Sequence, residues 1–278
     1  MSTPGGRAAS NETRNGLMVS AKPSNYSPKT ASGARPASRS VLLAENEKLA
    51  GSPVPLLQEL SEREQKDVLA QGVRRVIRRR QMLFAQGTPH DGIYLIQSGR
   101  MRVFYTAPSG REITLAYWHQ GNFVGGPEVF GSGLHLWSGA AVTDCSLVHF
   151  PGKVLRRLVL QIPNLAIGVI EGLAFKGKCY SALAQMLGTR SITERLAQLL
   201  LHLADSYGVR EQDDIVVSAA LTHADIAHMV GATRQWVTMS LKRLEEQGLL
   251  TSSKSKIVIH RLDELGSLRG AAQAAPDF

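Results

Sequence analysis

The stretch from residue 221 to residue 250, LTHADIAHMVGATRQWVTMSLKRLEEQGLL, constrains the fold more than any other part of the chain. Thr222 is placed to cap one short helix with an apolar face, and Thr233 is placed to cap a second. Gly231 lies between them and permits a tight turn, because glycine adopts backbone angles that other residues avoid. The pattern predicts two short helices joined by a turn.

The second of these helices would carry a polar outer face. An Arg or Gln near the start of such a helix can pair with guanine or adenine edges, while Thr and Lys can hold phosphates. Between Arg234 and Arg261, six basic residues face two acids. The alternative is a helical hairpin whose polar face is only solvated. The candidate DNA-binding residues are Thr222, His223, Thr233, Arg234, Gln235, Thr238, Met239 and Lys242.

Two separate parts of the chain, residues 73–150 and the part after residue 191, have the patterns of β-strands. Short segments rich in Val, Ile, Phe and Tyr run from Val73 to Phe150 with turn signals at a short, fairly even spacing, which predicts a barrel or sandwich. The basic run RRVIRRR (74–80) is either an anion patch or a half-exposed strand. After residue 191, a helix, a strand (DIVVSA) and a later IVIH strand predict a winged helix-turn-helix.

A long helix is predicted from about Asn164 to Thr189, because Pro163 suits its start. Gly168 and Gly172 weaken a helix, so a close approach by another helix is the expected reason for them. The apolar positions keep to spacings of three, four and seven and form a stripe that can pair with the same stripe of another chain. They are residues 165, 169, 173, 180, 183 and 187.

Residues 1–50 are predicted to be a disordered basic tail. Large aliphatic residues are almost absent from 1–40, and this segment supplies +5 of the formal charge of +9. A basic arm that touches DNA phosphate is the alternative. Residues 271–278 are expected to be a flexible C-terminus.

No run of apolar residues is long enough to cross a membrane, so a cytoplasmic location is expected. Cys145 and Cys179 lack a CxxC partner and are expected to be buried thiols, and no metal site is expected.

The helix-turn-helix stretch closely resembles that of the CRP/FNR family of bacterial transcription regulators. The resemblance extends from about Leu56 to Leu265, and GTPHDGIYLIQSGRMRVF (87–104) and SGREITLAYWHQGNFVGG (109–126) look like the family's cyclic-nucleotide-binding β-roll. It implies an α+β chain with an effector-sensing antiparallel β-roll at 51–163, a dimerisation helix at 164–190 and a winged helix-turn-helix DNA-binding domain at 191–270. A homodimer, a near-palindromic DNA site, RNA polymerase as a partner and an effector pocket are likewise implied.

The effector segment departs from the family pattern. Nucleotide-binding members have a Gly-Glu-Leu start and an Arg-Ser pair, whereas GGPEVFGSGLHLWSGAA here contains no Arg. With that cation gone, a phosphate would be held by backbone N–H groups alone, which disfavours cyclic AMP. An aromatic, uncharged pocket fits a flat or apolar effector; alternatively, the aromatic residues simply fill a vacated pocket. The candidate effector-binding residues are Gly125, Glu128, His135, Trp137, Ser138, Tyr180 and Ser181.

Other readings stay open. The effector and any cofactor are unknown; haem is a minor alternative, with His119, His135, Cys145 and Cys179 as nominal ligands. Gln235 and Met239 stand where many members have Glu and Arg, so the operator need not be the usual one. No motif provides a catalytic constellation, and we expect no enzyme activity. Two other functions compete with transcription regulation. One is a ligand-sensing regulatory subunit of an enzyme, and the other is a binding module whose helix-turn-helix contacts protein.

Overall fold

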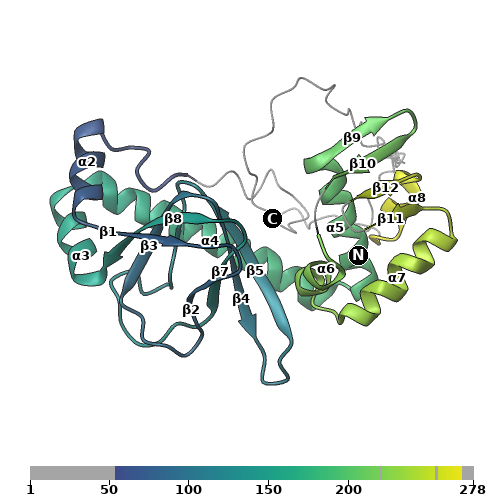
Figure 1. The fold of residues 1–278 in the computed structure, drawn as a ribbon, viewed down its shortest axis with the longest axis horizontal. Coiled ribbons are helices and arrows are strands. Elements are labelled where there is room, and N and C mark those ends of the chain that lie inside the picture. Colours follow the sequence, from purple (N-terminus) through teal and green to yellow (C-terminus); the bar gives the residue numbers. More distant parts are fainter. Residues whose placement is uncertain (1–53, 219–220, 254–255, 271–278) are drawn as a thin grey trace, which may run out of the picture. The chain divides into compact units, whose positions relative to one another are not determined.

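The computed structural model describes residues 54–218, 221–253 and 256–270 (Figure 1). The tail predicted for residues 1–50 and the flexible end predicted for residues 271–278 lie outside the described residues. The described chain has an α+β fold, with antiparallel strands before a long helix and a second set of helices and strands after it.

The strands before the long helix form two antiparallel sheets of four strands each. A helix, α2 (Glu62–Ala70), precedes them, and its N-cap Ser61 forms a capping box with Glu64. The first sheet has the order β1 (Val73–Ile77), β8 (Cys145–Pro151), β3 (Gly92–Ser98), β6 (Phe123–Val124). The second has the order β2 (Met82–Phe84), β7 (Ser138–Ala141), β4 (Arg100–Thr106), β5 (Glu112–His119).

The basic run 74–80 lies mostly on β1, which is an edge strand of the first sheet. Four of its five residues are exposed, as expected of a strand with one partner. Arg78 forms an exposed ion pair with Asp144, at 3.2 Å. The reading as an exposed strand is therefore sufficient to account for this run.

The core of the β-roll is built by alternation along its strands. Ile93 and Leu95 of β3 pack in one apolar cluster with Phe123 and Phe150, whereas Ile96 packs in a second cluster with Trp118. Burial of these side chains contributes roughly 25 cal/mol per Å² of apolar surface, which makes the two clusters the main source of stability here.

Two helices follow the β-roll, α3 (Gly152–Gln161) and α4 (Pro163–Thr189). The predicted start after Pro163 is confirmed, because this proline occupies the first turn of α4. The predicted stripe is wrong in its first half: Leu165 and Val169 are buried in the β-roll core of their own chain, and Leu173 packs against that core. The apolar face of α4 that remains exposed is not the predicted stripe.

Gly168 and Gly172 also have a different reason from the expected one. A Cβ atom on Gly168 would collide with the carbonyl oxygen of Leu56, and a Cβ atom on Gly172 would lie 2.5 Å from Cε1 of Phe123. Both glycines therefore allow α4 to pack closely on its own β-roll. The prediction that they accommodate another helix is wrong.

The elements after α4 form a winged helix-turn-helix, as predicted. The helices are α5 (Ile192–Tyr207), α6 (His223–Val230), α7 (Arg234–Glu246) and α8 (Leu262–Ser267). The strands form one sheet in the order β11 (Leu250–Ser252), β12 (Ile257–Ile259), β10 (Asp214–Val217), β9 (Gly208–Glu211), of which β9 was not predicted.

The turn between α6 and α7 is built as the sequence indicates. Thr222 caps α6 in a capping box with Asp225, and Thr233 caps α7 by accepting the backbone N–H of Trp236. Gly231 ends α6 with a left-handed φ of 66°, which favours glycine. Val237, Leu241 and Leu244 of α7 are buried, so its opposite face is left to solvent.

Candidate effector cavity and DNA-binding surface

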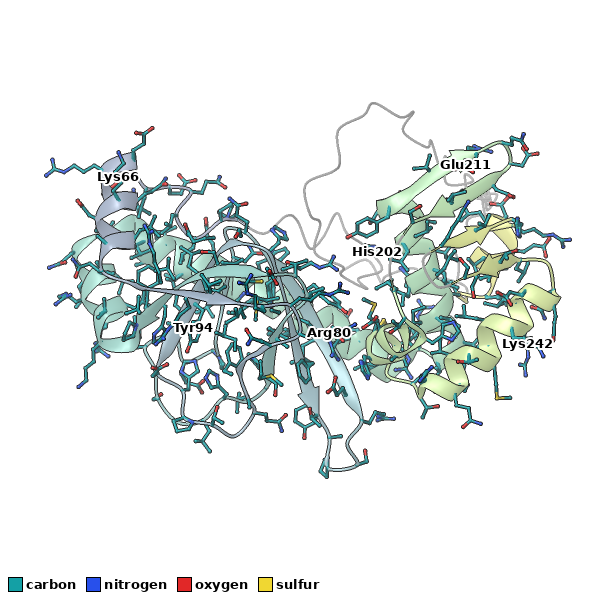
Figure 2. All side chains as sticks on the ribbon, viewed as in Figure 1. Lys66, Arg80, Tyr94, His202, Glu211 and Lys242 are labelled. Carbon is teal, nitrogen blue, oxygen red and sulfur yellow. The ribbon has the colours of Figure 1, made fainter. Side chains whose placement is uncertain are left out.

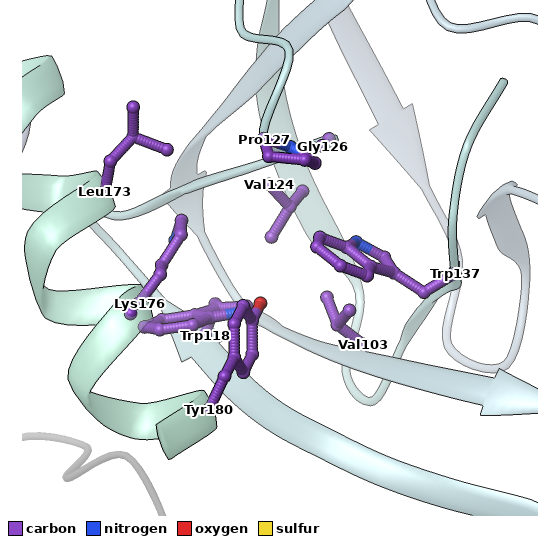
Figure 3. Close-up of a pocket in the computed structure, with 11 residues that line it drawn as sticks. Val103, Trp118, Val124, Gly126, Pro127, Trp137, Leu173, Lys176 and Tyr180 are labelled. Atoms are coloured by element: carbon purple, nitrogen blue, oxygen red, sulfur yellow. The ribbon is translucent and has the colours of Figure 1, made fainter. Parts of the chain in front are cut away.

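A cavity of about 320 Å³ lies between α4 and the strands of the β-roll (Figure 3). Its lining is almost wholly apolar and aromatic. Lys176 is the single Lys, Arg, His, Asp or Glu residue in this lining, and it stands on α4 one turn before Tyr180. The lining residues are Val103, Trp118, Val124, Gly125, Gly126, Pro127, Trp137, Leu173, Lys176, Gly177 and Tyr180.

The Lys176 side chain runs along the wall of this cavity (Figure 3). Its Nζ atom lies 3.5 Å from the centroid of the Trp118 ring and 4.5 Å from that of Phe123. The residue is only 9% exposed, and this burial lowers the pKa of Lys176 to about 7. The cavity therefore contains a titratable ammonium group surrounded by aromatic rings.

Three of the seven candidate effector-binding residues line the cavity. Trp137 enters from the segment before β7, Tyr180 comes from α4, and Gly125 follows β6. Trp137 and Tyr180 face each other with ring centroids 5.5 Å apart. Burial raises the pKa of the Tyr180 hydroxyl, so this group is a neutral donor at physiological pH.

The backbone conformation at position 125 requires glycine. Its φ is 148°, and a Cβ atom there would lie 2.8 Å from the carbonyl oxygen of Gly92 on β3. No larger residue fits without moving that strand. Gly125 therefore lets the chain pass close to β3 and turn into the cavity wall.

The other four candidates are not among the lining residues. Glu128 and Ser181 are exposed, and the Ser138 hydroxyl accepts a hydrogen bond from the backbone N–H of Gln86 at 3.0 Å. His135 is buried, with its ring stacked on Phe84 at a centroid distance of 4.3 Å, and burial lowers its pKa. The structure does not bring these four residues to the cavity.

Lys176 is not among the residues that the sequence predicts for this cavity. The sequence predicts no side-chain cation there, because the segment between β6 and β7 contains no Arg. The structure supplies one from α4 instead, so that expectation is wrong. A signal was available: Lys176 precedes Tyr180 by four residues, which places both on one face of a helix.

The nominal haem ligands do not meet at the cavity. None of His119, His135, Cys145 and Cys179 is among its lining residues. Both cysteines are buried thiols, as predicted. Among the described residues, no group of three or more His, Cys, Asp or Glu side chains is arranged to hold a metal ion.

The predicted DNA-binding residues lie on and beside α7. Thr233, Arg234, Gln235, Thr238 and Lys242 are all exposed. Met239 is 60% exposed. All of them except the N-cap Thr233 belong to α7, and the buried residues of α7 point the other way.

Hydrogen bonds order part of this surface. The Thr238 hydroxyl donates to the backbone oxygen of Arg234 at 3.0 Å, and Nδ1 of His223 lies 2.9 Å from Thr238 Oγ1. The first bond lies within α7, and the second links the first turn of α6 to α7. Lys242 extends from α7 (Figure 2) and pairs with Glu246 at 3.7 Å, but both side chains are so exposed that this pair contributes little. Thr222 is occupied in capping α6.

Two family models match this chain. Residues 74–161 match a cyclic nucleotide-binding domain, and residues 194–268 match a Crp-like helix-turn-helix domain. A CRP-like cAMP-activated global transcriptional regulator of Mycobacterium tuberculosis is 28% identical over 184 residues, or 66% of this chain and 82% of the relative. A global nitrogen regulator of Synechococcus elongatus is 26% identical over 179 residues, or 64% and 81%.

A solved structure has the same fold. It is the c-di-GMP responsive global regulator CLP of Xanthomonas campestris, with a TM-score of 0.65, 21% identity, and coverage of 72% of this chain and 99% of that one. The names of these three proteins refer to cAMP, to nitrogen and to c-di-GMP, so similarity to them does not identify one effector. Among the described residues, no helix is long and apolar enough to span a membrane.

Proposed function

Because this chain belongs to the CRP/FNR family of transcription regulators, we propose that it binds a specific DNA sequence through α7 under the control of an effector other than cyclic AMP. The observation that supports DNA binding is the exposed face of α7. Arg234 and Gln235 stand in its first turn, where the N-terminus of a recognition helix contacts base edges. Lys242 stands further along the helix and is exposed, and its amine can hold a phosphate.

We propose that the active species is a homodimer. The exposed face of α4 carries apolar and small residues at alternating spacings of three and four, which is the pattern of a coiled-coil seam. Ile167 and Ile170 on this face are 47% and 60% exposed, although both are large and apolar. We define the seam as Ile167, Ile170, Ala174, Gly177, Ser181 and Ala184, all of which are exposed in the single chain.

A two-fold dimer presents two α7 helices related by symmetry, so the DNA site is expected to be near-palindromic. RNA polymerase is the partner through which such a regulator would act, and a cytoplasmic location follows from both partners. These statements depend on the dimer and on the DNA-binding role of α7. The relatives described above carry names of transcription regulators, and we propose no enzyme activity for this chain.

The chemistry of the cavity lining supports an effector other than cyclic AMP. The lining contains no carboxylate, amide or aliphatic hydroxyl side chain; its polar side-chain groups are the two indole N–H groups, the Tyr180 hydroxyl and the Lys176 amine. A cyclic nucleotide carries a ribose hydroxyl and a polar base as well as its phosphate. These groups would lose their hydration and find few partners, which costs binding free energy.

The proposed DNA-binding role is tested by selecting sequences from a random DNA pool with the full-length protein. We expect one enriched near-palindromic motif, and we expect the Arg234→Ala variant to lose preference for the base pairs that the motif specifies. The Lys66→Ala variant on α2 removes the same charge from an exposed site away from α7 and should select the same motif. The DNA-binding role would be refuted if the wild-type protein enriched no motif, either alone or with a cell extract that supplies effectors.

A further inference from the structure

The charge of Lys176 has no opposite charge beside it. No ion pair or hydrogen bond joins its Nζ atom to any described residue, and its close neighbours are the rings of Trp118 and Phe123. Cys179, one turn away, is the titratable group that acts on Lys176, and burial raises the pKa of this thiol to about 11. A thiol with that pKa is neutral at physiological pH and does not balance an ammonium group.

An unbalanced ammonium in an apolar wall is expensive. Removing a charge from water costs more free energy than a cation regains over an aromatic face, even when the cation is desolvated. A methionine would fill the same volume without this cost. The position of Lys176 therefore makes physical sense if its charge is used by something that enters the cavity.

The cavity also restricts the shape of what can enter. Trp118, Trp137 and Tyr180 supply flat faces around it, and Val103, Val124 and Leu173 supply aliphatic ones. Such a lining favours a flat, apolar body. Its polar side-chain groups are few, and among them only Lys176 carries a positive charge.

We propose that the cavity binds a small aromatic acid, with its flat body among the aromatic side chains and its single negative charge against the ammonium of Lys176. This inference rests on the proposed function, because it assigns a chemical class to the effector of the same regulator. Carboxylate, sulfonate and phosphodiester groups share the charge that Lys176 would recognise. The absence of ribose-binding groups from the lining favours an aromatic carboxylate over a nucleotide.

Lys176 would then act as a specificity group. An anion beside it stabilises the protonated amine and raises its pKa, so binding is coupled to proton uptake above pH 7. A neutral ligand of the same shape gains the stacking but not the charge pairing. It would also leave the ammonium buried and unpaired, so the site should discriminate against it.

The test uses the full-length protein and two probes of one shape, naphthoate and the uncharged naphthamide, measured by titration calorimetry at pH 6 without DNA. We expect naphthoate to bind the wild-type protein at least about tenfold more tightly than naphthamide. In Lys176→Met the preference should disappear, whereas Lys176→Arg should keep a preference for the anion. Lys178→Met removes a charge from an exposed position of the same helix and should bind naphthoate like the wild type.

A pH series on the wild-type protein needs no variant. The Kd for naphthoate should rise by up to about tenfold per pH unit above the pKa of about 7, because a proton must then be taken up on binding. The Kd for naphthamide should show no such rise. The proposal is overturned if naphthoate fails to bind at millimolar concentration, if both probes bind equally, or if Lys176→Met and Lys178→Met lose naphthoate equally.

Cyclic AMP serves as the third probe and separates the two sources of negative charge. Binding of cyclic AMP that is lost in Lys176→Met would support an anion site at Lys176 and overturn the preference for an aromatic acid. Because none of these titrations contains DNA, their outcome is independent of the sequence selection described above. A protein that selects a DNA motif but does not bind naphthoate would keep the proposed function and lose this inference.

Discussion

The Nζ atom of Lys176 lies 3.5 Å from the centroid of the Trp118 ring, in a wall that contains no carboxylate. The ring face holds the ammonium by a cation–π contact but does not replace the water that it has lost. The result is an amine whose pKa is lowered to about 7. Stability and ligand binding should both depend on this one group.

Lys176→Met should flatten the dependence of stability on pH. Lysine has a pKa of 10.5 in the unfolded chain and about 7 in the folded one, so between these values the unfolded state holds more protons. The free energy of unfolding of the wild type should therefore rise with pH across this window, relative to the variant, by about 1.4 kcal/mol per pH unit. Below pH 7 the variant should be the more stable protein.

Urea unfolding between pH 6 and pH 10 measures this difference. Lys178→Met is the control, since it removes the same charge from an exposed position of the same helix. Parallel profiles for Lys176→Met and the wild type would show that Lys176 keeps an ordinary pKa in the folded state.

Arg234→Ala and Gln235→Ala should each reduce preference for the cognate operator by roughly 1–3 kcal/mol, because both side chains are exposed at the start of α7. Lys242→Ala should instead weaken binding to all sequences and reduce the salt dependence by about one phosphate contact. Fluorescence anisotropy with operator and random duplexes at several salt concentrations distinguishes these effects. Equal discrimination by the wild type and both α7 variants would contradict the assignment.

Ile170→Glu should separate the proposed dimer. Ile170 is 60% exposed in the single chain, and two carboxylates placed opposite each other across a two-fold axis would be buried without partners. Sedimentation velocity should show a monomer. Leu160→Glu makes the same change at a 78% exposed position on α3 and should remain a dimer, which excludes a general effect of added charge.

Gly168→Ala should destabilise the β-roll, because its Cβ atom would meet the backbone oxygen of Leu56, which cannot rotate away. Gly188→Ala is the matched control near the end of α4. Its Cβ atom would meet nothing within 4 Å, so this variant should gain up to about 1 kcal/mol from helix propensity. Thermal unfolding of both variants gives the comparison, and a stabilised Gly168→Ala would show that α4 does not approach Leu56 so closely.

Millimolar cyclic AMP should neither raise the melting temperature nor change the affinity for the operator. A ligand that binds only the native state adds several kcal/mol of stability when its concentration is far above its Kd. Calorimetry with the full-length protein decides this point. A saturable isotherm with a micromolar Kd would contradict it.

Local signals in the sequence are sufficient to predict α6, α7 and the exposed face of α7. Thr222 and Gly231 determine where α6 begins and ends, and Thr233 determines where α7 begins, through bonds to residues three or four positions away or through backbone angles. The exposed face of α7 follows from helical periodicity, because its buried residues recur at spacings of three and four. Such interactions depend on near neighbours and can be read without the fold.

The cavity and the packing of α4 depended on the tertiary structure. Periodicity identifies an apolar stripe, but it does not say whether the stripe packs on its own chain or on another one, and Leu165 and Val169 proved to belong to the β-roll core. In the same way, nothing near Lys176 in the sequence indicates that Trp118 and Phe123, which lie more than 50 residues away in the chain, surround its amine. The composition of a cavity is set by contacts between distant segments, and only the folded chain brings those segments together.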